Sequence, residues 1–118
     1  MASQRWRVLL GADAERDFGA ILAWTTERFG ERQARTYKET LLEAVRALEE
    51  GPAIIGAKTR DDIRPGLMSL HVARGGRRGR HFIMFRVMEK ADLRTIEVVR
   101  LLHDAMELAR HMPGGEAP

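Results

Sequence analysis

The most apolar part of the chain lies between Gly79 and Met106, where two hydrophobic runs are separated by a charged turn. The first run extends from His81 to Met88 and the second from Ile96 to Leu102. Short runs that are rich in Phe, Ile and Val are typical of strands near the middle of a sheet. The polar cluster from Glu89 to Asp92 has the length of a hairpin turn. The pattern predicts a central β-hairpin that the rest of the chain covers.

Two amphipathic helices are predicted upstream of this hairpin. The first begins at Asp13, a suitable N-cap, and ends at Gly30; the second follows at once and ends at Gly51 and Pro52. The short link predicts an antiparallel helical hairpin with one apolar face. Apolar residues recur at spacings of three and four, as a helix face requires; they are Ala14, Phe18, Ile21, Leu22 and Phe29 in the first helix and Ala34, Tyr37, Leu41, Ala44, Val45 and Leu48 in the second.

Two further strands are expected outside the central pair. Residues Arg5 to Leu10 form a short candidate, and Leu67 to Ala73 alternates apolar and polar positions, as a half-buried strand does. Between the helices and this strand, residues Ala53 to Pro65 are polar and irregular, and residues Arg74 to Gly79 form a basic hairpin tip.

After the last strand, a short helix is expected over Asp104 to Met112, with residues Pro113 to Pro118 frayed. The order β-α-α-β-β-β plus a C-terminal helix predicts one α+β domain over residues 1–118. In this fold a helical hairpin packs on a small antiparallel sheet.

The central strands are apolar on both faces. Alternation places Phe82, Met84 and Met88 on one face and Ile83, Phe85 and Val87 on the other. A helical hairpin covers only one face, and an apolar patch of that size is rarely left in water. The second face therefore needs the C-terminal helix, a partner protein or another copy of the chain.

Composition adds limits to this picture. The chain has 118 residues, of which 44% are hydrophobic, so it can bury a core without staples. It contains no cysteine, which excludes disulfides, thiolate metal sites and a thiol nucleophile. The formal net charge is +3, which permits an acidic partner but does not by itself indicate nucleic-acid binding. No run approaches the ~20 apolar residues of a membrane span, so we expect a cytoplasmic protein without membrane association.

Six stretches carry a resemblance to a known family. In chain order they are ADAERDFGAILAW with the early strand before it, FGERQARTY, LEEGPAIIG, IRPGLMSLHV, RHFIMFRV and VVRLLHDAMELARHM, and they extend over nearly the whole length, from Val8 to Met112. Their order and spacing resemble the RelE/ParE superfamily of bacterial type II toxins, and the ParE branch more closely. The resemblance implies a compact α+β toxin that is encoded beside an antitoxin (ParD-like) and neutralised by direct binding. It also implies DNA gyrase as the target, a role in plasmid stabilisation, and no cofactor.

The RelE branch supplies an enzymatic alternative, because its members cleave messenger RNA in the ribosome. That reaction needs cations around the scissile phosphate, groups that move protons and, in many members, a tyrosine near the C-terminus. Arg100 matches the family arginine on the last strand, but the only tyrosine is Tyr37, in the second predicted helix. His81 and His103 could transfer protons, because histidine has the right intrinsic pKa. A further alternative is a toxin fold that has lost toxicity and only binds an antitoxin-like partner.

Candidate site residues follow from these alternatives. Arg100 is either a functional cation on the open face of the sheet or the partner of a carboxylate such as Glu97 or Asp104. His103 is more simply a structural residue that bonds the nearby backbone, and Trp24 and Phe29 are most simply core. For the ParE-like reading, the residues expected to engage target or partner are Arg64, Arg78, Arg80, Arg86, Arg100, His103, Arg110 and His111.

Two other kinds of site are not expected. The four histidines, His71, His81, His103 and His111, lack the spacing of a metal site on a helix. The basic tip of Arg74, Arg77, Arg78 and Arg80 could grip phosphates. A solvated hairpin tip accounts for it more simply, because no lysine-serine pair or following helix makes it a nucleotide-binding loop.

Overall fold

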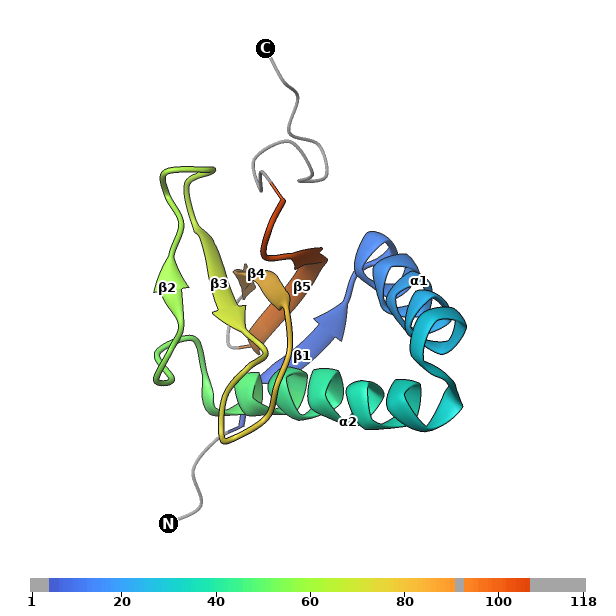
Figure 1. The fold of residues 1–118 in the computed structure, drawn as a ribbon. Helices are drawn as coiled ribbons and strands as arrows, with labels where there is room; N and C mark the ends of the chain where they lie inside the picture. The colour runs from blue at the N-terminus through green and yellow to red at the C-terminus, as the bar shows by residue number, and fades with distance from the viewer. Residues whose placement is uncertain (1–4, 91–92, 107–118) are drawn as a thin grey trace.

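The computed structural model describes residues 5–90 and 93–106 and contains two helices packed on a five-stranded sheet. The chain order matches the predicted α+β fold (Figure 1). The elements are β1 (Arg7–Leu10), α1 (Ala12–Phe29), α2 (Glu31–Ala47), the 3-10 turn η1 (Leu48–Glu50), β2 (Lys58–Thr59), β3 (Leu67–His71), β4 (His81–Lys90) and β5 (Leu93–His103).

The sheet has the order β1-β5-β4-β3-β2 and is mixed. The pairs β2–β3, β3–β4 and β4–β5 are antiparallel, as predicted. Strand β1 instead pairs with β5 in parallel, with Val8 opposite Ile96. After β1 the chain forms the helical hairpin and strands β2 to β4, and only the last strand, β5, lies beside β1. So long a connection between two paired strands allows them to be parallel. The two-residue strand β2 lies inside the segment that was expected to be irregular.

The helical hairpin turns at Gly30, whose φ of 94° lies in the left-handed region that favours glycine. The two helix axes open into a V in Figure 1 and do not lie antiparallel as expected. Helix α1 starts two residues earlier than predicted, with Gly11 and not Asp13 as its N-cap. The reason is that Gly11 continues the sheet and donates its N–H to the carbonyl of Val98 at 2.9 Å, so the chain enters the helix directly.

The main core lies between the helices and one face of the sheet. It contains the predicted face of β4, Ile83 and Phe85, and side chains from both helices and the neighbouring strands. The other face has a small cluster of its own, in which Met84, Leu102 and Leu67 are buried. Ile63, from the segment before β3, packs against that cluster and covers part of the face that was expected to need a cover.

A β-bulge in β5 changes which of its residues face the helices. Met84 pairs with Arg100 and Phe85 with Val98, so Val99 is the extra residue. A bulge breaks strict alternation. As a result Val98 and Leu101 both lie in the main core, while Val99 packs against the second cluster.

The predicted C-terminal helix is only partly within the described residues. Asp104 and the two residues after it form a turn, and residues 107–118 lie outside the described part of the chain. Among the helices that the structure describes, none is long and apolar enough to cross a bilayer.

Candidate functional site

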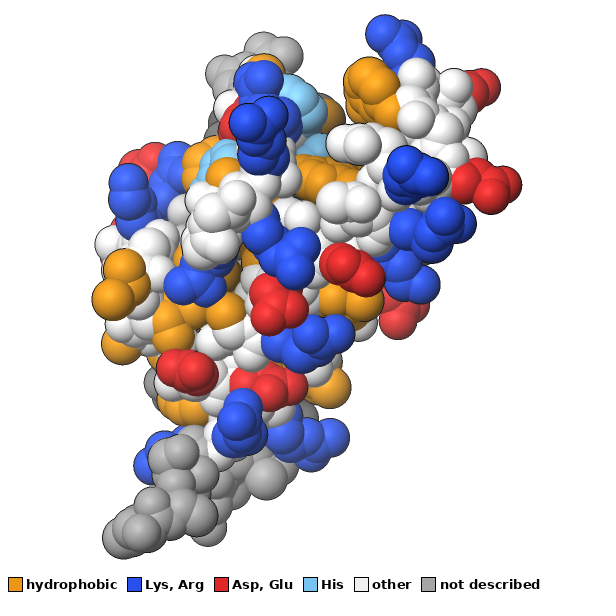
Figure 2. Space-filling model, turned by 60° about the horizontal axis from the view of Figure 1, so that its bottom comes forward, with side chains coloured by type: hydrophobic (Ala, Val, Ile, Leu, Met, Phe, Trp, Pro, Cys, Tyr) orange, Lys and Arg blue, Asp and Glu red, His pale blue; other side chains and the backbone are white. Residues whose placement is uncertain are grey.

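An apolar depression lies where the helical hairpin faces the loop between β3 and β4. We call it the hairpin groove; its volume is about 630 Å³. Figure 2 shows histidine and hydrophobic side chains gathered together on this side of the molecule, with basic side chains around them. The groove is lined by Trp24, Thr25, Phe29, Gln33 and Tyr37 from the helices, by Ala73, Arg77, Arg78, Gly79 and Arg80 from the loop, and by His81 and His103 from the sheet.

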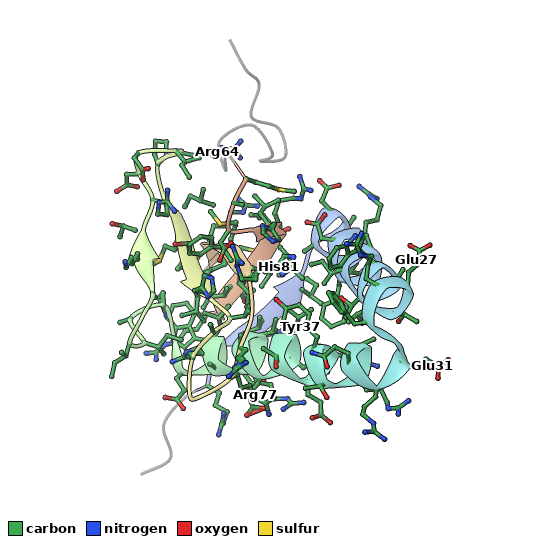
Figure 3. The ribbon with its side chains drawn as sticks, viewed as in Figure 1. Glu27, Glu31, Tyr37, Arg64, Arg77 and His81 are labelled. Carbon is green, nitrogen blue, oxygen red and sulfur yellow. The ribbon has the colours of Figure 1, made fainter. Side chains whose placement is uncertain are left out.

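Tyr37 connects the helices to the floor of the groove. It points from α2 toward His81 on β4 (Figure 3). Its hydroxyl oxygen accepts the backbone N–H of Arg80 at 3.0 Å, and the same hydroxyl lies 2.7 Å from Nδ1 of His81. Since the oxygen already accepts one bond, its own hydrogen is available for His81. Burial raises the pKa of Tyr37, so the hydroxyl keeps that hydrogen.

His81 is held in its neutral form. Its Nδ1 accepts from Tyr37, which leaves the ring hydrogen on Nε2. Burial, followed by the proximity of His103, lowers the pKa of His81 to about 4. The two imidazole rings lie edge to face with their centroids 5.3 Å apart. His81 therefore does not carry the charge that a cationic phosphate site would need from it at neutral pH.

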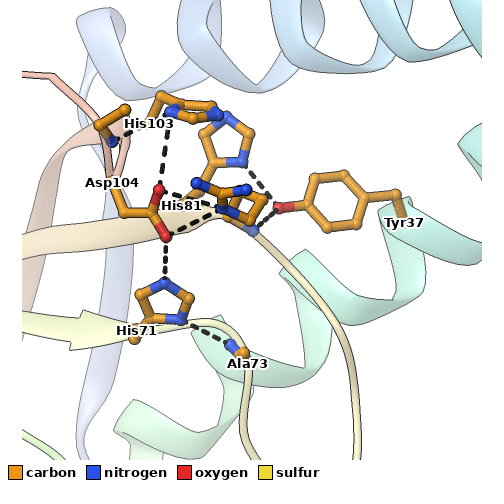
Figure 4. Close-up of polar contacts among 8 residues, drawn as sticks. Tyr37, His71, Ala73, His81, His103 and Asp104 are labelled. Atoms are coloured by element: carbon orange, nitrogen blue, oxygen red, sulfur yellow. Dashed lines mark hydrogen bonds and ion pairs between the residues drawn. The ribbon is translucent and has the colours of Figure 1, made fainter.

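Asp104 is the hub of the polar network at the end of the sheet (Figure 4). It accepts from Nε2 of His71 at 2.9 Å and from Nε of Arg80 at 3.2 Å, and its own backbone N–H bonds the carbonyl of Arg80. The hydrogen bond from His71, and then the contact with Arg80, lower the pKa of Asp104. Its carboxylate thus ties together β3, the basic loop and the end of β5.

The basic tip, residues 74–80, which we call the basic loop, packs back on the protein. Three of its four arginines donate to internal acceptors: Arg74 to the carbonyl of Ile55 at 3.2 Å, Arg77 to Thr40 at 3.3 Å, and Arg80 to Asp104. The fourth, Arg78, is exposed and lines the groove. Three of the four guanidinium groups are therefore held in place by the chain's own acceptors, but only that of Arg80 meets a carboxylate, so the loop remains positively charged.

Arg100 pairs with a carboxylate that sequence reasoning did not name. Its guanidinium donates to Asp17 of α1 at 2.6 and 2.9 Å, and the same carboxylate accepts the backbone N–H of Leu101 at 2.9 Å. These bonds raise the pKa of Arg100. Glu97 instead pairs with Arg86 at 2.8 Å. Asp17 therefore joins α1 to the stretch of β5 that extends beyond β1.

The structure brings only part of the predicted residue set together. Arg78, Arg80, His81 and His103 line the hairpin groove. Arg64 and Arg86 line a separate depression near the start of α1, and Figure 3 places Arg64 and Arg77 at opposite ends of the molecule. Nδ1 of His103 accepts the N–H of Ala105 at 3.0 Å, which is the backbone bond expected of a structural histidine. Arg110 and His111 lie outside the described residues.

Two aromatic residues of the groove were missed, because Trp24 and Phe29 were assigned to the core. They are 53% and 62% exposed and stack edge to face at 5.8 Å. Trp24 directly precedes the buried Thr25, so it points roughly 100° around the helix from the buried side. The offset is evident only from the structure, because nothing in the sequence marks Thr25 as buried. Phe29 is the last residue of α1.

A metal centre finds no support among residues 5–90 and 93–106, where no three potential ligands of the His, Asp or Glu type come together. His71 and His103 each use Nδ1 as an acceptor for a backbone N–H, from Ala73 and Ala105 respectively. The polar network is thus satisfied by the chain's own groups.

The architecture has counterparts among solved toxins. A structure titled as the chromosomal ParDE TA system from P. aeruginosa matches with a TM-score of 0.66 and 20% identity, covering 86% of this chain and 98% of that chain. The YoeB/ParE toxin from Agrobacterium tumefaciens matches with a TM-score of 0.55 and 15% identity, over 82% and 97% of the two chains. At these identities the likeness defines the class by fold, which is that of the ParE and RelE toxins.

Sequence comparison gives the family. Residues 8–108 match the model of the ParE toxin of type II toxin-antitoxin systems, parDE. Toxin ParE1 of Mycobacterium tuberculosis, from strains CDC 1551 and H37Rv, is 32% identical over 106 residues, which is 90% of this chain and 97% of the relative. The chain therefore belongs to the ParE toxin family of type II toxin-antitoxin systems, as its resemblance predicted.

Proposed function

We propose that this ParE-family protein inhibits DNA gyrase by binding it in the cytoplasm, and that a cognate antitoxin neutralises the toxin by direct contact. The family match over residues 8–108 carries the proposal. A binding mechanism asks for a rigid, exposed surface and not for a set of groups poised for proton transfer. The hairpin groove meets that description, because it presents exposed aromatic and cationic side chains and its walls are joined by the hydrogen bonds of Arg80 to Tyr37 and Asp104.

The states of the candidate catalytic residues also favour binding over catalysis. Phosphodiester cleavage through a 2′-hydroxyl needs a base, an acid and cations at the phosphate. Arg100 is bonded to Asp17, and His81 has a pKa of about 4, far from the value near neutrality that suits a general base. Asp104 holds Arg80.

The test is controlled expression of the full chain in bacteria, with growth, plasmid supercoiling and transcript integrity followed in the same cells. We expect growth arrest with altered supercoiling, DNA damage and intact transcripts. A supercoiling assay with purified gyrase and purified toxin should show inhibition that added antitoxin reverses. Normal supercoiling in arrested cells, together with gyrase that the purified toxin leaves active, would refute the proposal.

One observation keeps the ribonuclease as a second candidate. His81 and His103 lie ring against ring beside the Tyr37 hydroxyl, so two groups able to exchange protons share one surface. Rapid cleavage of translated messenger RNA, lost in a His81→Gln variant that stays folded, would establish that activity. A stable antitoxin complex without any growth arrest from the free chain would instead point to a toxin fold that has lost its toxicity.

A further inference from the structure

The outer wall of the hairpin groove is aromatic and open to solvent. Trp24 and Phe29 pack on each other at the tip of the helical hairpin, and the Arg28 guanidinium lies 5.4 Å from the Trp24 ring centroid. Large aromatic side chains that stay in water forgo the free energy of burial, and rigid aromatic residues are the commonest energetic anchors of protein interfaces. The wall thus offers a place where an apolar side chain can be buried.

The opposite wall is cationic. Arg77, Arg78 and Arg80 line it, and none of the described residues that line the groove is acidic. Asp104, which bonds Arg80, also accepts a bond from His71. Arg78 is exposed and has no side-chain partner among the described residues. An occupant of this groove therefore meets an unbalanced positive potential, which favours a segment that carries carboxylates.

The two walls are fixed relative to each other. Tyr37 accepts the Arg80 N–H and bonds His81, and Arg77 bonds Thr40, so the basic loop is tied to α2 at two places. Gly79 allows the close approach, since a Cβ there would come within 2.5 Å of a Val72 methyl group. A preformed groove costs little ordering free energy when a partner binds.

The size of the groove limits what it can accept. About 630 Å³ is the volume of an ordinary ligand pocket, into which one or two large side chains fit. A short part of a partner chain can therefore insert its anchors here while the rest of that chain lies outside the groove.

We propose that the hairpin groove is where the antitoxin docks, through a segment that inserts an aromatic or large aliphatic side chain against Trp24 and Phe29 and directs a flanking carboxylate to Arg78. The inference rests on the proposed function in one respect, the existence of a neutralising antitoxin. The apolar wall supplies affinity, and the cationic wall fixes the orientation of the segment.

The experiment measures the affinity of the full-length toxin for the purified antitoxin encoded beside it, with two pairs of matched variants. Trp24→Ser removes an exposed groove aromatic, and Ile55→Ser removes an apolar side chain that is 90% exposed outside the groove. Arg78→Glu reverses a groove charge, and Arg32→Glu reverses an exposed charge of α2 that does not line the groove. Circular dichroism and urea unfolding check that each variant is folded.

We expect Trp24→Ser to raise Kd about 30-fold or more, as loss of an interface anchor does. Arg78→Glu should raise Kd about 10-fold and flatten its dependence on salt, because one charge contact is lost. The two control variants should stay within about twofold of the wild type, the size of change that ordinary surface substitutions produce.

Each contrary outcome identifies what has failed. Equal affinity across all variants overturns the groove assignment and leaves the proposed function intact, because an antitoxin still binds. A wild-type toxin that binds no antitoxin overturns both. If Trp24→Ser abolishes self-association or gyrase binding while antitoxin affinity is unchanged, the groove belongs to a second copy or to the target, and the proposal is wrong.

Discussion

The helical hairpin is tied to the rest of the fold by polar contacts at two places, and these places use their polar groups differently. On one side, Asp17 of α1 binds Arg100 and the Leu101 N–H, so the carboxylate is used entirely within the chain. On the other side, the hub of Asp104 and Tyr37 braces the basic loop and leaves Trp24, Phe29 and Arg78 exposed at its margin. The first contact serves only to hold α1 against β5, whereas the second holds the basic loop in place beside exposed side chains that a partner can contact.

The comparison shows that residue type alone does not tell whether an arginine stabilises the fold or is available to bind a partner. Arg100 and Arg78 are both arginines, and both were candidates for target or partner binding. One is half-buried and bonded to a carboxylate on another element, and the other is exposed. Changes on the Asp17 side should therefore cost folding stability, and changes on the groove side should cost binding.

The largest effect on stability is expected from Asp17→Ala. It leaves the guanidinium of Arg100 and the N–H of Leu101 without this acceptor in a part of the protein that is only 16–23% exposed. Breaking such a contact lowers the free energy of unfolding by about 2–4 kcal/mol. Urea unfolding measures it. Asp13→Ala, which removes the exposed ion pair with Arg16, is the control and should cost less than about 1 kcal/mol. Equal losses in the two variants would contradict the assigned role of Asp17.

Tyr37→Phe should have an intermediate effect. The ring is kept, but the Arg80 N–H and His81 Nδ1 lose their partner, which costs about 1–2 kcal/mol. Hydrogen exchange should show the loss directly, as faster exchange at the Arg80 amide than at amides in the middle of β4. Unchanged protection at Arg80 would mean that Tyr37 does not brace the loop.

Acidification should weaken the fold through His81. The folded-state pKa of His81, about 4, lies below the ordinary histidine value of 6.5. The unfolded chain therefore binds the proton first, and stability present above pH 6.5 falls as the pH drops toward 4. The slope should stay below the roughly 1.4 kcal/mol per pH unit that one proton allows. Urea unfolding at several pH values measures it. In His81→Gln the slope across this window should be smaller, and an unchanged slope would assign the effect to other groups.

The smallest effect on stability is expected from Trp24→Ser. Because the side chain is 53% exposed, its removal should change the unfolding free energy by less than about 1 kcal/mol. The comparison predicts that this variant unfolds like the wild type and binds antitoxin poorly, whereas Asp17→Ala does the reverse at concentrations where it remains folded. A large loss of stability in Trp24→Ser would contradict the exposed position of Trp24 and support the sequence-based assignment of this residue to the core.

The elements and the α+β class could be predicted from local patterns. Periodicity identified both helices, alternation identified β3, and the two faces of β4 follow the predicted sets, with Ile83 and Phe85 toward the helices and Met84 away from them. Each of these features depends on residues within a few positions of one another, and for that reason a sequence pattern records them. The family also follows from the sequence, because the order of its short stretches extends over nearly the whole chain.

The tertiary structure alone decided how these elements meet. The parallel pairing of β1 with β5, the bulge at Val99, and the bond between Asp17 and Arg100 across 83 positions join distant parts of the chain. The exposure of Trp24 and Phe29 depends on where the helical hairpin opens, which no local pattern records. Charge and hydrophobicity are properties of residues, but burial and pairing are properties of positions in space, and those became definite only when the sheet and the hairpin came together.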